Sequence, residues 1–158
     1  MPDFKPRSIC LVHGVLTSGA LAKIKTKGGA HVVICEGRPS LRAGEHNSRS
    51  FLSKKVKPFI ICDNMAGFLF FKGFVKEVVL ACQYADKTGA LCDIGALVLA
   101  VLAKKHKVAV CLLEAEHKKH FLGSPKDLLT LKGIATAPHG TQAYAPLVEW
   151  VPAKYLKK

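Results

Sequence analysis

Residues 8–39 decide the fold of this chain and read SICLVHGVLTSGALAKIKTKGGAHVVICEGRP. Two short apolar runs, at 8–12 and 31–35, flank a segment at 17–27 that can be helical and that ends at Gly28-Gly29, a pair suited to a helix C-cap. Both runs are nearly continuous rather than alternating, which is typical of strands buried on both faces. A strand, a helix and a second such strand predict a βαβ unit with parallel strands and a right-handed crossover.

The same alternation continues through most of the chain. Further strand-like runs lie at 58–62, 77–82 and 108–113, and segments with helical composition lie at 41–55, 64–71 and 91–106. The last of these ends in basic residues, as the helix dipole favours. We therefore predict an α/β fold: a single Rossmann-like domain over residues 1–158, with a parallel sheet of about five strands and helices on both faces.

Composition narrows the class of protein. The chain has 158 residues, of which 49% are hydrophobic and 22% charged, so it can fill a core and is not disordered by composition. Its apolar runs break well before the roughly 18 residues of a membrane helix, and residues 1–12 do not fit a secretion signal. None of the six cysteines forms a CxxC pair. We expect a cytoplasmic protein with reduced thiols and no membrane association.

The formal net charge of +13 attracts polyanions such as nucleic acid and phosphorylated metabolites. The lysines are scattered along the chain, and no RNP motif, zinc finger or arginine-rich arm accompanies them. A solvated lysine-rich surface and association with RNA or the ribosome both remain open.

Polar residues follow the predicted strands at the edge where parallel sheets bind ligands. His13 follows the first strand. The helix after it opens with Thr17-Ser18-Gly19, a segment that can bind a phosphate or act as an ordinary helix cap. Arg38 follows the second strand and can bind a phosphate or pair with Glu36.

The third strand ends at Asp63-Asn64. An aspartate there can bind sugar hydroxyls, hold a loop, or act as a helix N-cap.

Several familiar sites are missing from the sequence. It has no GxGxxG, no phosphate-binding GxxxxGK[ST] loop and no G-x-S-x-G elbow. His117 and His120 stand near Glu114 and Glu116, but Lys118 and Lys119 between them would repel a cation. We expect no metal and no cofactor.

Four segments, taken in order, resemble a known family over nearly the whole chain. They are Glu36-x-Arg38-Pro39, Cys62-Asp63-Asn64-Met65-Ala66-Gly67, Ile94-Gly95-Ala96, and the closing Tyr144-Ala145-Pro146 with Val151-Pro152-Ala153-Lys154-Tyr155-Leu156. Together they are similar to the C-terminal domain of methylthioribose-1-phosphate isomerase. The same family includes ribose-1,5-bisphosphate isomerase and the α, β and δ subunits of eukaryotic initiation factor 2B. Its isomerases also carry a helical N-terminal domain that contributes substrate contacts.

The resemblance implies catalytic positions that this chain fills differently. Family isomerases place a catalytic cysteine after the histidine that ends the first strand, where this chain has Gly14. A catalytic aspartate at the end of the fourth strand corresponds to Gln83, which cannot be a general acid or base at neutral pH. An Asn-Lys pair that helps hold phosphate corresponds to Cys92-Asp93, and a phosphate-contacting glutamine corresponds to Arg42.

These changes favour a divergent binding or regulatory module for a phosphorylated sugar or nucleotide. The predicted pocket is lined by His13, Thr17, Ser18, Gly19, Arg38, Arg42, Asp63, Asn64 and Gln83. The alternative is an active aldose–ketose isomerase with displaced catalytic groups, for which Asp63, Gln83 and Cys82 are the candidates, or one completed by a partner chain. The resemblance also implies a homodimer.

Overall fold

The first two apolar runs form neighbouring strands of one sheet. The computed structural model describes residues 4–24, 30–117 and 120–156. Strands β1 (Ile9–His13) and β2 (His31–Cys35) pair in parallel, and helix α1 (Ser18–Lys23) lies between them in the sequence. The predicted C-cap at Gly28-Gly29 falls outside the described residues; α1 ends at Lys23, because Ile24 is already extended.

Five strands form the parallel part of the sheet, which confirms the predicted α/β class. Their spatial order is β3-β2-β1-β4-β6, with β3 at Phe59–Ile61, β4 at Val75–Asp86 and β6 at Ala109–Glu114. Two further strands extend the sheet through antiparallel pairs. Strand β5 (Gly89–Asp93) pairs with the C-terminal part of β4, and β9 (Val148–Pro152) pairs with β5.

The helix predicted over 91–106 begins later than its composition suggests. Strand β5 occupies its first residues, and helix α4 runs over Ala96–Lys105 after Gly95, whose φ is +96°. A turn sends the chain back from β4 into β5: the Asp86 carboxylate accepts bonds of 2.7 Å from both the amide and the hydroxyl of Thr88. These bonds lower the Asp86 pKa. Strand β9 then pairs with β5, a long-range contact that local composition does not reveal.

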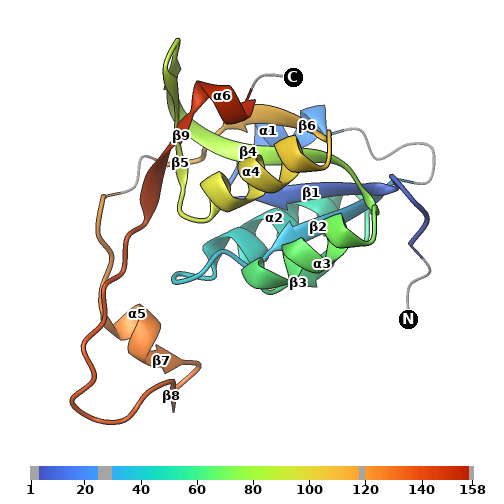
Figure 1. Ribbon diagram of the computed structural model, residues 1–158. Coiled ribbons are helices and arrows are strands. Elements are labelled where there is room, and N and C mark those ends of the chain that lie inside the picture. Colours follow the sequence, from blue (N-terminus) through green and yellow to red (C-terminus); the bar gives the residue numbers. More distant parts are fainter. Residues whose placement is uncertain (1–3, 25–29, 118–119, 157–158) are drawn as a thin grey trace.

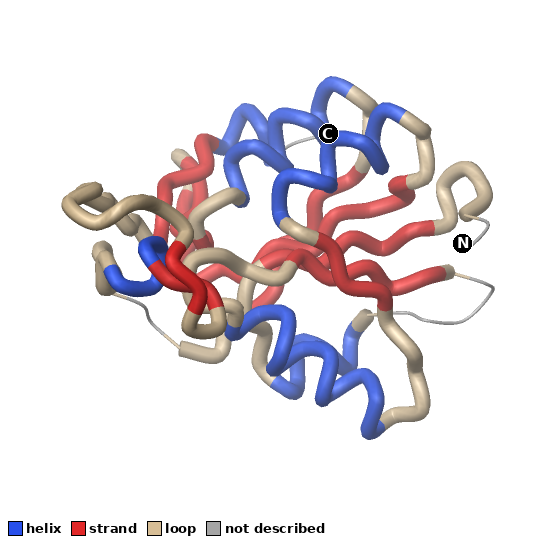
Figure 2. The backbone as a smooth tube through the Cα atoms, turned by 90° about the horizontal axis from the view of Figure 1, so that it is seen from below, coloured by secondary structure: helices blue, strands red, loops and turns tan. Residues whose placement is uncertain are grey.

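Helices cover both faces of the sheet, which explains the continuous apolar runs (Figure 2). Ile9 and Leu11 of β1 face the core beneath α3 (Ala66–Phe71) and α4, while Cys10 and Val12 face the core beneath α1 and α2 (Arg42–Ser53). The alternation follows from the two-residue period of a strand. Helix α6 (Ala153–Leu156) joins the α4 side.

The segment between β6 and β9 departs from this layered body. It contains α5 (Lys126–Leu129) and a hairpin of β7 (Thr130–Leu131) and β8 (Ile134–Ala135), which lie apart from the main sheet in Figure 1. All six cysteines carry free thiols. None of the described helices is long and apolar enough to cross a bilayer.

A buried asparagine joins α2 to the segment after β1. Asn47 is fully buried; its Nδ2 donates to the Gly14 carbonyl at 2.8 Å, and its Oδ1 accepts from the Leu16 amide at 3.3 Å. No sequence pattern distinguished this residue, because an asparagine within a polar helix is ordinarily exposed.

We predict that Asn47→Ala lowers the free energy of unfolding by about 2–4 kcal/mol, because two buried backbone groups lose their partners. Urea denaturation measures the change. Asn64→Ala is the matched control, since Asn64 is exposed, and it should change stability by less than about 0.5 kcal/mol. Equal effects in both variants would contradict the role of Asn47.

Candidate functional site

The chain turns that follow β1, β2 and β5 meet at the carboxyl edge of the parallel strands. They enclose a cavity of about 10 Å³, room for about one water molecule. Its lining is His13, Gly14, Gly37, Arg38, Pro39, Ser40, Asp93, Ile94 and Leu147. The cavity therefore lies at the edge of the sheet where the topology predicts ligands, and two of the predicted ligand-binding residues, His13 and Arg38, line it.

Asp63 holds the turn after β2 in place. Its Oδ1 accepts from the Gly37 amide at 2.9 Å and its Oδ2 from the Arg38 amide at 2.7 Å. Of the roles left open by the sequence, loop holding is the one observed, and the N-cap is not: Cys62 precedes the 3₁₀ turn η1 (Asp63–Met65), and no side chain caps it. The carboxylate thereby fixes the backbone from which the Arg38 side chain projects.

Arg38 is the cationic group of the cavity lining. It is half-buried, and among the residues that the structure describes no carboxylate forms an ion pair with its guanidinium. The pairing with Glu36 considered from the sequence is thus not formed. A guanidinium that borders a cavity and forms no ion pair with a carboxylate is chemically suited to bind an anion.

His13 is buried beside Arg38, with 2% of its surface exposed. Its Nε2 lies 2.8 Å from the carbonyl oxygen of Ile94, so Nε2 carries the hydrogen and Nδ1 the lone pair. Nδ1 is buried and has no hydrogen-bond partner. The ring packs closely against Gly95, where an added Cβ would lie 3.1 Å from the His13 Cε1 atom.

Asp93 is a site residue that the sequence analysis missed. By resemblance, Asp93 stands at the position of a lysine that helps hold phosphate. In the structure its side chain lines the cavity, is 4% exposed, and accepts a hydrogen bond from the Val15 amide at 3.2 Å. Its position depends on the β4–β5 hairpin, which returns the chain to the carboxyl edge. The sequence feature that could have identified Asp93 is an acidic residue at the end of an apolar run.

Glycine is required at position 14, where the resemblance places a catalytic cysteine. Gly14 has φ of +83°, and a Cβ there would lie 2.6 Å from the Ala81 Cβ and 2.8 Å from the Asp93 carboxylate. A thiol-bearing side chain does not fit this backbone.

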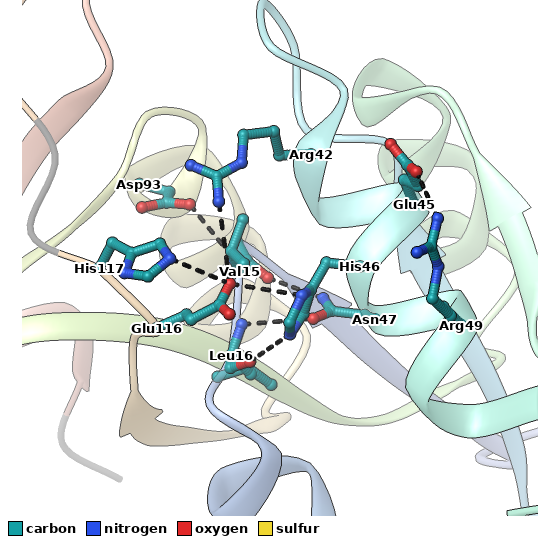
Figure 3. Close-up of polar contacts among 11 residues, drawn as sticks. Val15, Leu16, Arg42, Glu45, His46, Asn47, Arg49, Asp93, Glu116 and His117 are labelled. Atoms are coloured by element: carbon teal, nitrogen blue, oxygen red, sulfur yellow. Dashed lines mark hydrogen bonds and ion pairs between the residues drawn. The ribbon is translucent and has the colours of Figure 1, made fainter. Parts of the chain in front are cut away.

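Arg42 is not among the residues that line the cavity, and it belongs to a polar group around Glu116 (Figure 3). Its guanidinium is 3.9 Å from Glu116 Oε2, which is also 3.3 Å from His46 Nδ1 and 3.7 Å from His117 Nε2. Arg42, Glu45, His46 and Arg49 line a separate hollow of about 180 Å³. Within the described part of the chain, His117 and His120 do not gather into a group of potential metal ligands.

The remaining predicted residues lie outside the cavity lining. Thr17 caps α1 through a 3.1 Å bond from the Ala20 amide, and Ser18, Gly19 and Asn64 are exposed. Cys82 and Gln83 lie at the start of the β4–β5 hairpin, where Cys82 pairs with Cys92 in the register. Only Asp63, through the loop it holds, joins His13 and Arg38 at the site.

Comparison with known proteins finds relatives that share one enzyme name. Methylthioribose-1-phosphate isomerase of Thermus thermophilus is 29% identical over 138 residues, covering 80% of this chain and 42% of that protein. The enzyme of the same name from Chloroflexus aurantiacus is 26% identical over 170 residues, covering 93% of this chain and 49% of that protein. The chain thus spans about half the length of the curated relatives it matches.

Solved structures show the same fold. The delta subunit of translation initiation factor eIF-2B from A. fulgidus superposes with a TM-score of 0.80 at 17% identity, covering 96% of this chain and 51% of the other. The 5-methylthioribose 1-phosphate isomerase of Pyrococcus horikoshii gives 0.78 at 24%, covering 96% and 49%. The model of the initiation factor 2 subunit family matches residues 8–158. This chain therefore belongs to that family of sugar-phosphate isomerases and initiation factor subunits.

Proposed function

We propose that this chain is a module that binds a phosphorylated sugar or nucleotide at the carboxyl edge of β1 and β2, without the isomerase chemistry of its relatives. The observation that carries the proposal is the Arg38 guanidinium, which borders the cavity without an acidic partner among the described residues. Asp63 clamps the backbone of that arginine. A guanidinium on a fixed backbone loses less entropy when it binds an anion.

The cavity lining supplies both kinds of group that a sugar phosphate needs. Arg38 can donate two parallel hydrogen bonds to phosphate oxygens. The Asp93 carboxylate can accept from sugar hydroxyls, and its negative charge directs the phosphate toward Arg38. Because the enclosed space is only about 10 Å³, the body of the ligand would lie over the mouth of the cavity.

The site residues support binding over the isomerisation catalysed by the relatives. Position 14 has no room for the thiol that the resemblance implies. Gln83, at the position of the implied aspartate, lies outside the cavity lining and carries an amide that neither gives nor takes a proton at neutral pH. Cys82 also lies outside the lining. A homodimer, a partner chain and RNA binding stay predictions.

We predict that Arg38→Ala weakens binding of 5-methylthioribose 1-phosphate about 10- to 100-fold, because a charge-assisted hydrogen bond contributes about 1.5–3 kcal/mol. Isothermal titration calorimetry measures the dissociation constant, with adenosine monophosphate as a second ligand. Arg49→Ala is the matched control: Arg49 is exposed, pairs with Glu45 at 2.7 Å and lines the separate hollow. Unchanged affinity for both ligands in Arg38→Ala would refute the site.

A second experiment separates binding from catalysis. In an NMR time course with 5-methylthioribose 1-phosphate, we expect ligand lines to broaden while no ketose signal grows. Ketose that accumulates with wild-type protein but not with Asp93→Asn would establish the isomerase alternative instead, with Asp93 as its proton-transfer group.

A further inference from the structure

Three potential metal ligands converge where β1, β2 and β3 end. His13 ends β1, Cys35 ends β2, and Asp63 follows β3, and these are adjacent strands in the sheet. Continuing the parallel register that pairs Val12 with Ile34 places His13 beside Cys35. A nitrogen, a sulfur and an oxygen from the three side chains lie within 4.8 Å of one another. We propose that they bind a divalent transition-metal ion, with Zn²⁺ as the preferred ion.

The histidine is prepared to act as a ligand. Its Nε2–H donates to the Ile94 carbonyl at 2.8 Å, which fixes the tautomer and leaves the lone pair on Nδ1. This is the arrangement of metal-bound histidines, whose second ring nitrogen commonly donates to a backbone carbonyl. Nδ1 is buried without a hydrogen-bond partner, an unfavourable state for a polar atom that a bound cation would remove.

The aspartate is oriented in the same way. Each of its carboxylate oxygens accepts one backbone N–H, from Gly37 and from Arg38. A carboxylate has about four acceptor positions, so Asp63 can hold the loop and still coordinate a cation. Hydrogen-bonded carboxylates of this kind are typical ligands in protein metal sites.

The buried thiol completes the donor set and selects the ion. Cys35 has no exposed surface, and its thiol carries a proton that a metal ion must displace in order to bind. Metal binding releases that proton to solvent, and one thiolate and one carboxylate then balance the charge of the dication. A mixed sulfur, nitrogen and oxygen set favours Zn²⁺ over Mg²⁺ or Ca²⁺.

Three protein ligands leave a fourth position for water or a ligand group. Tetrahedral Zn²⁺ separates its donors by about 3.5 Å, so the three side chains would draw slightly together from their present spacing. The inference does not rest on the proposed function, because Arg38 and Asp93 are the groups proposed to contact the sugar phosphate, and neither is among the three metal ligands. It revises the expectation of no metal that the sequence alone gave.

The test is titration of the full chain with Co²⁺ under reducing, anaerobic conditions. We expect a thiolate-to-cobalt charge-transfer band that saturates at about one ion per chain and that Zn²⁺ abolishes. We expect the band to be lost in Cys35→Ala and in Cys35→Ser, and the affinity to fall at least tenfold in His13→Gln. Absence of the band in wild-type protein at excess Co²⁺ would overturn the proposal.

Two control variants identify the thiol. Cys10 is as buried as Cys35 but faces the opposite side of the sheet, and Cys62 is an exposed thiol next to Asp63. Cys10→Ala and Cys62→Ala should keep the band. A band that persists in Cys35→Ala, or that disappears in Cys62→Ala, would assign the metal to surface thiols and refute the site.

Thermal unfolding keeps the test decisive if a Cys35 variant does not fold. Zn²⁺ should raise the Tm of wild-type protein and of Cys10→Ala, because the ion binds the folded state. The same rise in His13→Gln as in wild type would contradict the proposed ligand set.

Discussion

The two hydrogen bonds from the Gly37 and Arg38 amides to the Asp63 carboxylate are the interaction on which the site depends. They tie the turn after β2 to the end of β3, and so they set where the Arg38 side chain begins. Glycine at 37, with φ of +78°, allows this close turn, since an added Cβ would lie 2.6 Å from the Ala43 Cβ. A charged acceptor with two backbone donors is stronger than a neutral pair and resists fraying of the loop.

The sheet positions everything else at this edge. Because both of its faces are covered, the parallel strands have a fixed register, and their carboxyl ends bring His13, Cys35 and Asp63 together from separate parts of the sequence. The hairpin of β4 and β5 adds the Asp93 carboxylate from the other side. The result is a small site with one guanidinium, one buried carboxylate and one oriented imidazole.

The sequence was informative where local pattern determines structure. The runs at 8–12 and 31–35 predicted β1 and β2 because strands buried on both faces need continuous apolar residues, and the strand-end rule located His13 and Arg38. It was misleading at 91–106, where pairing with β9 makes a strand of residues with helical composition. Arg42 and Gln83 were linked to the pocket by resemblance alone, and neither lines the cavity. Asn47 and Asp93 could not be found without the tertiary contacts that bury them.

The central claim is that ligand binds at the clamped turn after β2, and amide chemical-shift mapping tests it most directly. In a ¹⁵N-labelled sample titrated with 5-methylthioribose 1-phosphate, we predict the largest shifts at Gly37, Arg38 and Ser40, with saturation, and little change at Ser18, Gly19 and Asn64. Shifts concentrated around Arg42, His46 and Arg49, with Gly37 and Arg38 unchanged, would contradict the claim and place the anion in the second hollow.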